Sequence, residues 1–254
     1  MDFITVTPEN LEQEHICCAI SNNKDCQVAS KKAWMAERFA DGLVFRKADA
    51  RGKCFIEYLP AERAWAPIEA PGYLHIDCFW VSGQLKGHGY ADELLDSCIE
   101  DARAQGKAGL TVLSSAKKQP FLSDPAYLRK RGFRTADTAA PGYELLHLPL
   151  GDAADAAELP RFKSHVKEPR TDDAGFALYY SPQCPFTAKY VPLVADVAAA
   201  RGVPLKTILL ETAEQAQNAP APFTAYSLFH DGVLLTHEIL SPKKFEKLLD
   251  ERGL

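Results

Sequence analysis

A glycine-punctuated turn is the segment of this sequence best placed to do chemistry. It reads Gln84-Leu85-Lys86-Gly87-His88-Gly89, follows a strand-like run, and leads directly into an amphipathic helix pattern that starts at Tyr90. The first amide N–H groups of a helix lack acceptors within the helix, and the helix dipole adds positive charge there. Glycines let this backbone approach a phosphate without Cβ clashes, while Lys86 and His88 place basic side chains at the rim. The turn therefore predicts an anion site; the alternative is a tight turn that needs glycine only for its backbone angles.

Cys184 is a second candidate for chemistry. It lies in the run Ser181-Pro182-Gln183-Cys184-Pro185-Phe186-Thr187, which opens a predicted helix. Because the positive end of a helix dipole stabilises a thiolate, we expect a lowered pKa and a reactive thiol here. Without CxxC or HxxxH spacing we predict no metal site, and we expect buried, apolar roles for the cysteines of apolar-patterned elements: Cys17, Cys18, Cys54, Cys78 and Cys98.

Length and composition exclude several classes of protein. The 254 residues are 46% hydrophobic and 25% charged, which is the range of globular proteins and not of disordered chains. The net charge of −5 argues against nucleic acid as a partner. No signal-peptide pattern opens the chain, and no run approaches the roughly 18 apolar residues of a membrane helix. With seven cysteines and no paired pattern, we expect a cytoplasmic protein with free thiols and no membrane contact.

The chain divides into two domains. Residues 151–173 contain few large apolar side chains and no sustained period, which predicts a linker or surface strap. Residues 1–150 and 174–254 are each long enough for a core of their own. In the first domain we predict strands over 3–7, 43–47, 54–59, 73–81, 110–113 and 143–148, and helices over 8–18, 31–39, 125–131 and from Tyr90 onward.

The predicted elements around the turn distinguish between the phosphate-binding motifs to which it could belong. A Rossmann turn would need three glycines and a following parallel strand, and a P-loop would need Gly-Lys-Ser/Thr. The motif Gln84-x-x-Gly87-x-Gly89 instead resembles the acetyl-CoA signature of the GNAT N-acetyltransferases, as does the helix ending in Gly132-Phe133. The order of elements over residues 1–150 agrees with that fold. The resemblance predicts an α/β (α+β) fold with a mixed, mainly antiparallel sheet, and acetyl-CoA as the acyl donor.

The resemblance also implies a division of roles within the site. The fourth strand would carry a bulge at about Phe79–Val81 whose backbone pairs with pantetheine, and the turn amides would hold the pyrophosphate. The residues implied in acetyl-CoA binding are Phe79, Trp80, Val81, Gln84, Leu85, Lys86, Gly87, His88, Gly89, Tyr90 and Ser114.

The same resemblance offers candidates for the proton transfers. A base is needed to keep the acceptor amine neutral, and His75, with an ordinary histidine pKa of about 6.5, is the first candidate. Asp77 and Glu57 are the others, since Asp77 shares a strand face with His75. Leu128 stands where the family often has a tyrosine acid, which leaves Tyr127, one residue earlier, as the candidate acid.

The second domain resembles the thioredoxin/glutaredoxin fold. Its pattern predicts strands over 176–180 and 205–210, a hairpin over 226–233 and a last helix over 242–249. The run around Cys184 is similar to the glutaredoxin active-site turn, but Thr187 replaces the second cysteine, so a dithiol cycle cannot close. Pro222 or Pro220 is the candidate for the cis-proline of such folds. In this order, the two modules resemble the YoaP-like GNAT proteins.

The function predicted from these features is direct transfer of acetyl from acetyl-CoA to a small-molecule amine, with the second domain shaping the acceptor site. The alternative is a monothiol redox or thiol-sensing protein centred on Cys184, in which the first domain binds CoA without catalysis.

Overall fold

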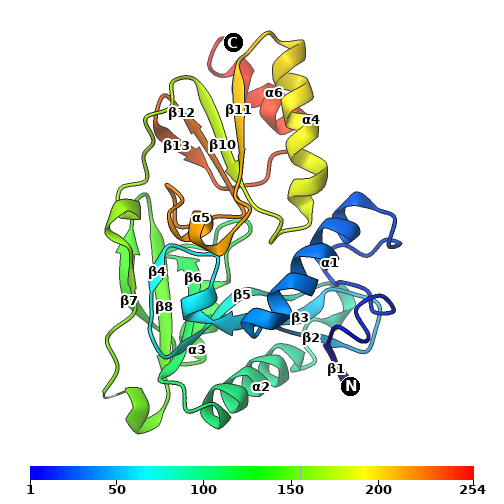
Figure 1. The fold of residues 1–254 in the computed structure, drawn as a ribbon, viewed down its shortest axis with the longest axis vertical. Coiled ribbons are helices and arrows are strands. Elements are labelled where there is room, and N and C mark those ends of the chain that lie inside the picture. The colour runs from blue at the N-terminus through cyan, green and yellow to red at the C-terminus, as the bar shows by residue number, and fades with distance from the viewer. Residues whose placement is uncertain (155) are drawn as a thin grey trace.

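Seven strands of the first domain form one mixed sheet in the order β1-β2-β3-β5-β6-β8-β7 (Figure 1). The computed structural model of the chain describes residues 1–154 and 156–254. Neighbouring strands are antiparallel except β5 and β6, which run parallel. The bounds are β1 (Phe3–Val6), β2 (Val44–Ala48), β3 (Cys54–Pro60), β5 (Tyr73–Val81), β6 (Gly109–Ser115), β7 (Arg134–Ala139) and β8 (Tyr143–Pro149).

Helices cover the two faces of this sheet differently. The α2 (Tyr90–Ala104) and α3 (Pro125–Lys130) helices pack on one face, against strand residues such as Ile56 and Ile76. The other face holds α1 (Cys26–Arg38) and, beyond it, the second domain (Figure 1). Because side chains alternate along a strand, the residues of β3 and β5 that point to this second face lie between the domains.

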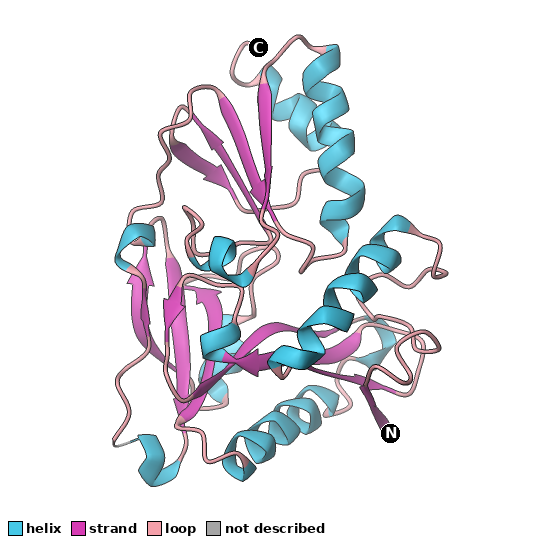
Figure 2. Cartoon of the chain, viewed as in Figure 1, coloured by secondary structure: helices cyan, strands magenta, loops and turns pink. Residues whose placement is uncertain are grey.

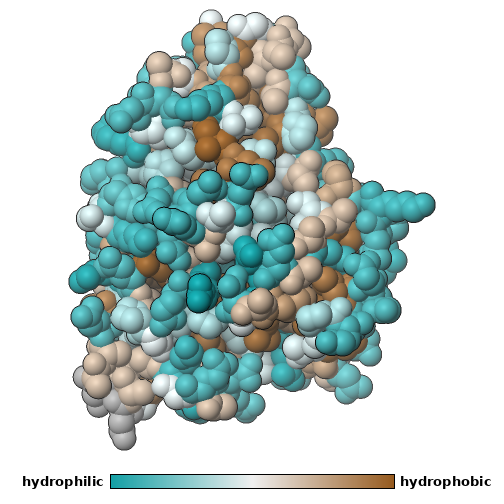
Figure 3. Space-filling model, in the orientation of Figure 1, coloured by the Kyte–Doolittle hydropathy of each residue, from teal (hydrophilic) through white to brown (hydrophobic). Residues whose placement is uncertain are grey.

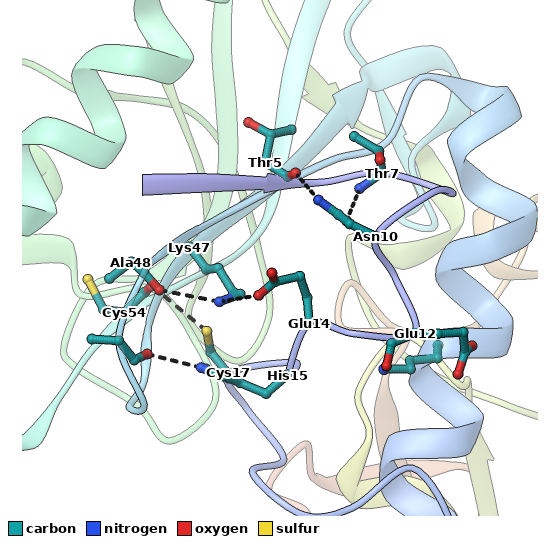
Figure 4. A network of polar contacts seen from close by, with 12 residues as sticks. Thr5, Thr7, Asn10, Glu12, Glu14, His15, Cys17, Lys47, Ala48 and Cys54 are labelled. Atoms are coloured by element: carbon teal, nitrogen blue, oxygen red, sulfur yellow. Dashed lines mark hydrogen bonds and ion pairs between the residues drawn. The ribbon is translucent and has the colours of Figure 1, made fainter. Parts of the chain in front are cut away.

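Residues 8–18 form turns, so the helix predicted there is wrong. The side chain of Asn10 accepts a hydrogen bond from the Thr7 amide at 2.8 Å, and Glu14 pairs with Lys47 at 2.7 Å (Figure 4). Such side-chain contacts give the backbone an alternative to helical hydrogen bonds. They fix this segment against β2 and β3 as an ordered loop.

Helix α1 begins five residues earlier than the pattern predicted, at Cys26 instead of Lys31. The carboxylate of Asp25 accepts a hydrogen bond from the Gln27 amide at 2.9 Å, which is the N-cap interaction. Strand β7 was missed altogether because, as an edge strand with mostly exposed or half-buried residues, it lacks a clear alternation of apolar side chains.

The second domain contains a four-stranded sheet in the order β11-β10-β12-β13, in which only β10 and β11 run parallel. Helices α4 and α6 pack against one face (Figure 2), and a smaller, buried apolar cluster lies on the other. Figure 3 shows apolar residues gathered on the surface of the upper part of the molecule, which is the second domain. The bounds are β10 (Phe176–Tyr180), α4 (Phe186–Ala200), β11 (Leu205–Leu209), α5 (Ala213–Gln217), β12 (Tyr226–His230), β13 (Val233–Thr236) and α6 (Pro242–Asp250).

The segment between the domains packs as a strap along the first domain. Its β9 strand (Arg161–Phe162) pairs with the short β4 strand (Ile68–Glu69), and Phe162 and Val166 are buried. The two domains also share a core, in which Leu210 and Ala216 pack with side chains of the first domain.

The one cis peptide bond among the described residues precedes Pro141, so the cis geometry suggested for Pro222 or Pro220 is wrong. None of the helices described here has both the length and the apolar character needed to cross a membrane.

Candidate active site

Parallel strands β5 and β6 separate after four paired positions, from Tyr73↔Gly109 to Ile76↔Val112. Beyond Ile76, β5 continues to Val81 along β3, and β6 continues to Ser115 along β8. In the described part of the chain, residues 77–81 therefore present one backbone edge to a gap without a strand partner. Unpaired N–H and C=O groups there can bind an extended ligand as a strand would.

A β-bulge lies at the start of this gap. In the β3–β5 register Glu57 pairs with Cys78 and Tyr58 pairs with Ile76, which leaves Asp77 as the extra residue. The bulge is thus two residues before the expected Phe79. Its effect is to turn the Asp77 and Cys78 side chains toward the second domain, while Phe79 packs on the α2 face.

The glycine turn adjoins the gap and has free amide groups. Gly87 and Gly89 have φ angles of 81° and 82°, in the left-handed region that favours glycine. The amides of Leu85 and Lys86 bond within the turn, to Ser82 and Gly83. In the described chain, no acceptor is found for the amides of Gln84, Gly87, His88, Gly89 and Tyr90.

The surroundings of the turn fit a phosphate group. A Cβ built on Gly87 or Gly89 would meet no atom within 4 Å, so open space lies in front of these residues. Helix α2 starts at Tyr90 without a side-chain cap, which leaves the positive end of its dipole facing that space. Free amides and a helix N-terminus are the groups that bind a diphosphate in other proteins, and the assignment of this turn to that role stays a prediction.

A buried ion pair lies on the side of the bulge that faces the second domain. The Nζ atom of Lys31 on α1 is 2.8 Å and 2.7 Å from the two carboxylate oxygens of Glu57 on β3. It also donates a hydrogen bond to the Gln183 carbonyl of the second domain at 2.8 Å. Both side chains are at most 2% exposed, and the contacts of the pair join α1, β3 and the second domain. The Lys31 ammonium thus donates two hydrogen bonds, to Glu57 and to Gln183, and its charge is paired with the Glu57 carboxylate.

His75 lies near Asp77 but is a weak base. Its Nδ1 is 3.0 Å from the Thr111 hydroxyl, its Nε2 is 3.8 Å from an Asp77 oxygen, and its side chain is 3% exposed. Burial lowers the pKa of His75 to about 4. The imidazole is therefore neutral at pH 7, and its affinity for a proton is low.

Asp77 combines deep burial with free hydrogen-bonding capacity. Its side chain is 1% exposed, and neither carboxyl oxygen has a hydrogen-bond partner among the described residues. Burial raises the pKa of Asp77 well above its usual value, the Glu57 carboxylate raises it further, and Lys31 and the nearby Gln183 side chain oppose the shift. Burial also raises the pKa of Glu57, against the effect of Lys31.

The raised pKa of Asp77 predicts a pH dependence of stability. Because the folded state keeps a proton that the unfolded state loses above the ordinary aspartate range, wild-type stability falls as the pH rises through this window. Asp77→Asn removes this titration. The difference in unfolding free energy between Asp77→Asn and wild type should therefore shift in favour of the variant from pH 5 to pH 8, as measured by urea denaturation.

Asp137→Asn is the matched control for this experiment. The Lys167 ammonium and the amide of Phe162 lower the pKa of Asp137 despite its desolvation. This carboxylate is thus ionised in both states above pH 5, and its variant should differ from wild type by the same amount at both pH values. A constant difference for Asp77→Asn as well would contradict the assigned protonation of Asp77.

The other predicted side chains have defined places. The Tyr127 ring contacts Phe79, with centroids 5.6 Å apart, and its hydroxyl donates to Asp92 at 3.1 Å. Burial and Asp92 raise the pKa of Tyr127, so it keeps its proton. Leu128 is buried, and the Ser114 hydroxyl donates a 2.7 Å hydrogen bond to the Ser123 carbonyl.

Cys184 adjoins the Lys31–Glu57 pair but does not have the lowered pKa expected of it. It precedes α4, whose first residue is Phe186, and burial raises the pKa of the thiol to about 11. A hydrogen bond from the Phe186 amide opposes this shift without offsetting it. The expectation of an acidic thiol is therefore wrong, because desolvation outweighs the effect of the helix terminus.

Two residues of the cluster were missed by the sequence analysis, namely Lys31 and Gln183. A signal for Lys31 was present: together with Val28, Lys32 and Met35 it occupies the i, i+3, i+4, i+7 stripe that faces a core. A lysine within such a stripe needs a buried partner. No comparable signal marks Gln183, which contributes its backbone carbonyl.

A sheet split between two parallel strands, beside a glycine turn at a helix N-terminus, defines the class: an acyl-CoA N-acyltransferase fold. Two family profiles match the chain. The Acetyltransferase (GNAT) family matches residues 9–133, and the YoaP-like family matches residues 204–247. The "Uncharacterized N-acetyltransferase YoaP" of Bacillus subtilis (strain 168) is 43% identical over 98% of this chain and 99% of its own length. The chain therefore belongs to the GNAT acetyltransferases, together with this relative.

Solved structures with similar chains include two from Brucella melitensis. A GNAT family acetyltransferase in complex with acetyl-CoA is 16% identical, covering 59% of this chain and 88% of its own, with a TM-score of 0.36. A ribosomal-protein-alanine N-acetyltransferase is 17% identical, covering 59% of this chain and all of its own, with a TM-score of 0.41.

Proposed function

We propose that this protein transfers acetyl from acetyl-CoA directly to the amine of a small molecule, at a site that its two domains form together. The observation that carries the proposal is the group of free amides at Gln84 to Tyr90, next to the gap between β5 and β6. In this arrangement the pantetheine arm pairs with the free edge of residues 77–81, and the diphosphate binds the turn. The thioester then lies by the bulge.

The chemistry needs little from the protein beyond positioning and proton transfer. The amine nitrogen forms a bond to the thioester carbonyl carbon, the C–S bond breaks, and the sulfur leaves with the electron pair. Tyr127 remains a candidate acid for that sulfur, since its ring lies against Phe79 and its pKa is raised. Of the candidate bases, Asp77 at the bulge has free oxygens, whereas Glu57 is held by Lys31.

The second domain, in this proposal, is thioredoxin-like and encloses the acceptor side of the bulge. Support comes from its strand order, in which a parallel pair at one edge is extended by an antiparallel hairpin, with α4 and α6 on one face. Further support is the contact between Gln183 and Lys31, which brings the loop before α4 onto the cluster. A cover of this kind keeps water from the thioester and limits the size of the acceptor.

The turn can be tested with Gly89→Ala, measured as the dissociation constant of acetyl-CoA by calorimetry on the full chain. A Cβ at this φ angle strains the backbone by about 1–2 kcal/mol and stands in the space assigned to the diphosphate. We expect affinity to fall at least about fivefold, the loss of roughly one charge-assisted hydrogen bond.

Gly106→Ala is the control, because it has the same left-handed strain and the same open surroundings at the far end of α2. It should bind acetyl-CoA as wild type does while losing similar stability. Equal weakening in both variants would mean that the turn is not the diphosphate site.

A further inference from the structure

The cluster behind the bulge contains one more buried carboxyl group than its cation can balance. Lys31 lies 2.8 Å and 2.7 Å from the two oxygens of Glu57 and donates a hydrogen bond to the Gln183 carbonyl, so its charge is already paired with one acid. Asp77, 1% exposed, has no partner on either oxygen among the described residues. A buried polar group without a partner is costly, which makes Asp77 a group prepared for a ligand.

The position of Asp77 identifies which ligand can reach it. The residue is the bulge itself, so its backbone borders the gap between β5 and β6 while its side chain points toward the second domain. The groups that face the carboxyl are Glu57 from β3, Lys31 from α1, Gln183 from the second domain and His75 from its own strand. None of them offers the carboxyl a free cation.

We propose that Asp77 binds the amine of the acetyl acceptor and that the acceptor is a small primary aliphatic amine without a carboxylate beside the amine. This inference rests on the proposed transferase function and specifies its substrate class. An ammonium supplies the hydrogen-bond donors and the positive charge that the Asp77 carboxyl lacks. A carboxylate on the neighbouring carbon would have to lose its water beside two buried acids, with Lys31 already occupied, and would be rejected.

With Asp77 as the group that takes a proton from the bound ammonium, every proton in the reaction is accounted for. Asp77 releases its proton to solvent as the ammonium binds and then takes one proton from the ammonium, and the resulting amine nitrogen bonds to the thioester carbonyl carbon. The C–S bond breaks, and the CoA sulfur takes the electron pair and the second proton of the nitrogen. Asp77 is then protonated as at the start, so that an ammonium and acetyl-CoA give an N-acetyl amine, CoA and the one proton released on binding.

The test compares pairs of acceptors that differ only in the carboxylate: isobutylamine with valine, and ethylamine with alanine. The full-length protein is incubated with acetyl-CoA and each probe, and the N-acetylated product is quantified by mass spectrometry. We expect kcat/KM for each amine to exceed that of its amino acid at least about fiftyfold, as expected for a buried unpaired charge that costs more than 2 kcal/mol. Faster acetylation of the amino acids would overturn the proposal.

Variants distinguish a role of Asp77 in binding the amine from a merely structural role. Asp77→Asn should lower kcat/KM for isobutylamine at least about a hundredfold, while the dissociation constant of acetyl-CoA stays within about twofold of wild type. Glu246→Gln, an exposed carboxylate on α6, should change neither value. Retention of amine turnover in Asp77→Asn would overturn the assignment. If that variant does not fold, the ratio of kcat/KM for the amine to kcat/KM for its amino acid, measured with the wild-type protein, tests the proposal.

The outcomes also distinguish this inference from the function on which it rests. A protein that does not bind acetyl-CoA would contradict the transferase function itself. A protein that binds acetyl-CoA but acetylates neither amine would contradict the acceptor class and leave the acetyl-CoA site in place.

Discussion

Replacing Lys31 with methionine is expected to lower the free energy of unfolding by about 3–5 kcal/mol, because it leaves the Glu57 carboxylate buried and without a cation. The Glu57 side chain is fully buried, and its two oxygens have their ammonium at 2.8 Å and 2.7 Å. The substitution also removes the hydrogen bond to the Gln183 carbonyl, which joins the domains. Urea denaturation at pH 7 measures the loss.

Two further variants distinguish the effect of leaving Glu57 without a cation from the effect of losing a buried lysine. Lys32→Met removes a neighbouring, equally inaccessible lysine whose ammonium donates to the Glu12 carbonyl and the Asn23 side chain, so its loss should cost only about 1–2 kcal/mol. Lys31→Met combined with Glu57→Leu removes both charges and should recover at least half of the loss. A Lys31→Met protein as stable as Lys32→Met would contradict the assigned role of the ion pair.

Local sequence patterns were sufficient for the elements that position the site. Strand β5 was predicted over its observed length, residues 73–81, and α2 was predicted to start at Tyr90. Both follow from short-range rules, since the strand has a continuous β-favouring run and the helix has an apolar face next to a glycine turn. The first strand of the second domain, residues 176–180, was predicted for the same reason.

The failures occur where the deciding contacts are distant in sequence. Residues 8–18 contain a plausible helix pattern, but Glu14 pairs with Lys47 and His15 with the Ala50 carbonyl, and these contacts hold the segment as a loop. A single-sequence pattern contains no information about such pairs. Propensity was overridden by tertiary contacts here.

The candidate site, too, could be predicted where local sequence patterns determine it and not where distant contacts do. The turn residues were predicted from glycine spacing together with a family resemblance, and the same resemblance made Asp77 and Glu57 candidates on their strands. Lys31 is 26 residues from Glu57 and 152 residues from Gln183, so the ion pair and its cover could not be predicted from local spacing. The burial that lowers the pKa of His75 and raises that of Asp77 depends on the docked second domain and was equally inaccessible.

The pKa of Cys184 provides the sharpest test between acetyl transfer and a thiol-centred function. Burial raises this pKa from 9.0 to about 11, which lowers the thiolate fraction at pH 8 by about a hundredfold. The higher intrinsic nucleophilicity of such a thiolate regains roughly tenfold, and restricted access removes part of that gain. We therefore expect Cys184 in the folded protein to react with iodoacetamide between about ten and a hundred times more slowly than in the unfolded chain.

The comparison is made within one protein, by site-resolved mass spectrometry of timed reactions at pH 8 with and without urea. Exposed Cys26 is the control, since folding does not shield it and its rate should change little. Cys184→Ser should acetylate isobutylamine within about threefold of wild type, because the proposed chemistry uses no thiol of the protein. Rapid alkylation of folded Cys184 together with loss of transfer in Cys184→Ser would favour a thiol-based function for the second domain, whereas slow alkylation with intact transfer leaves that domain as the cover of an amine site.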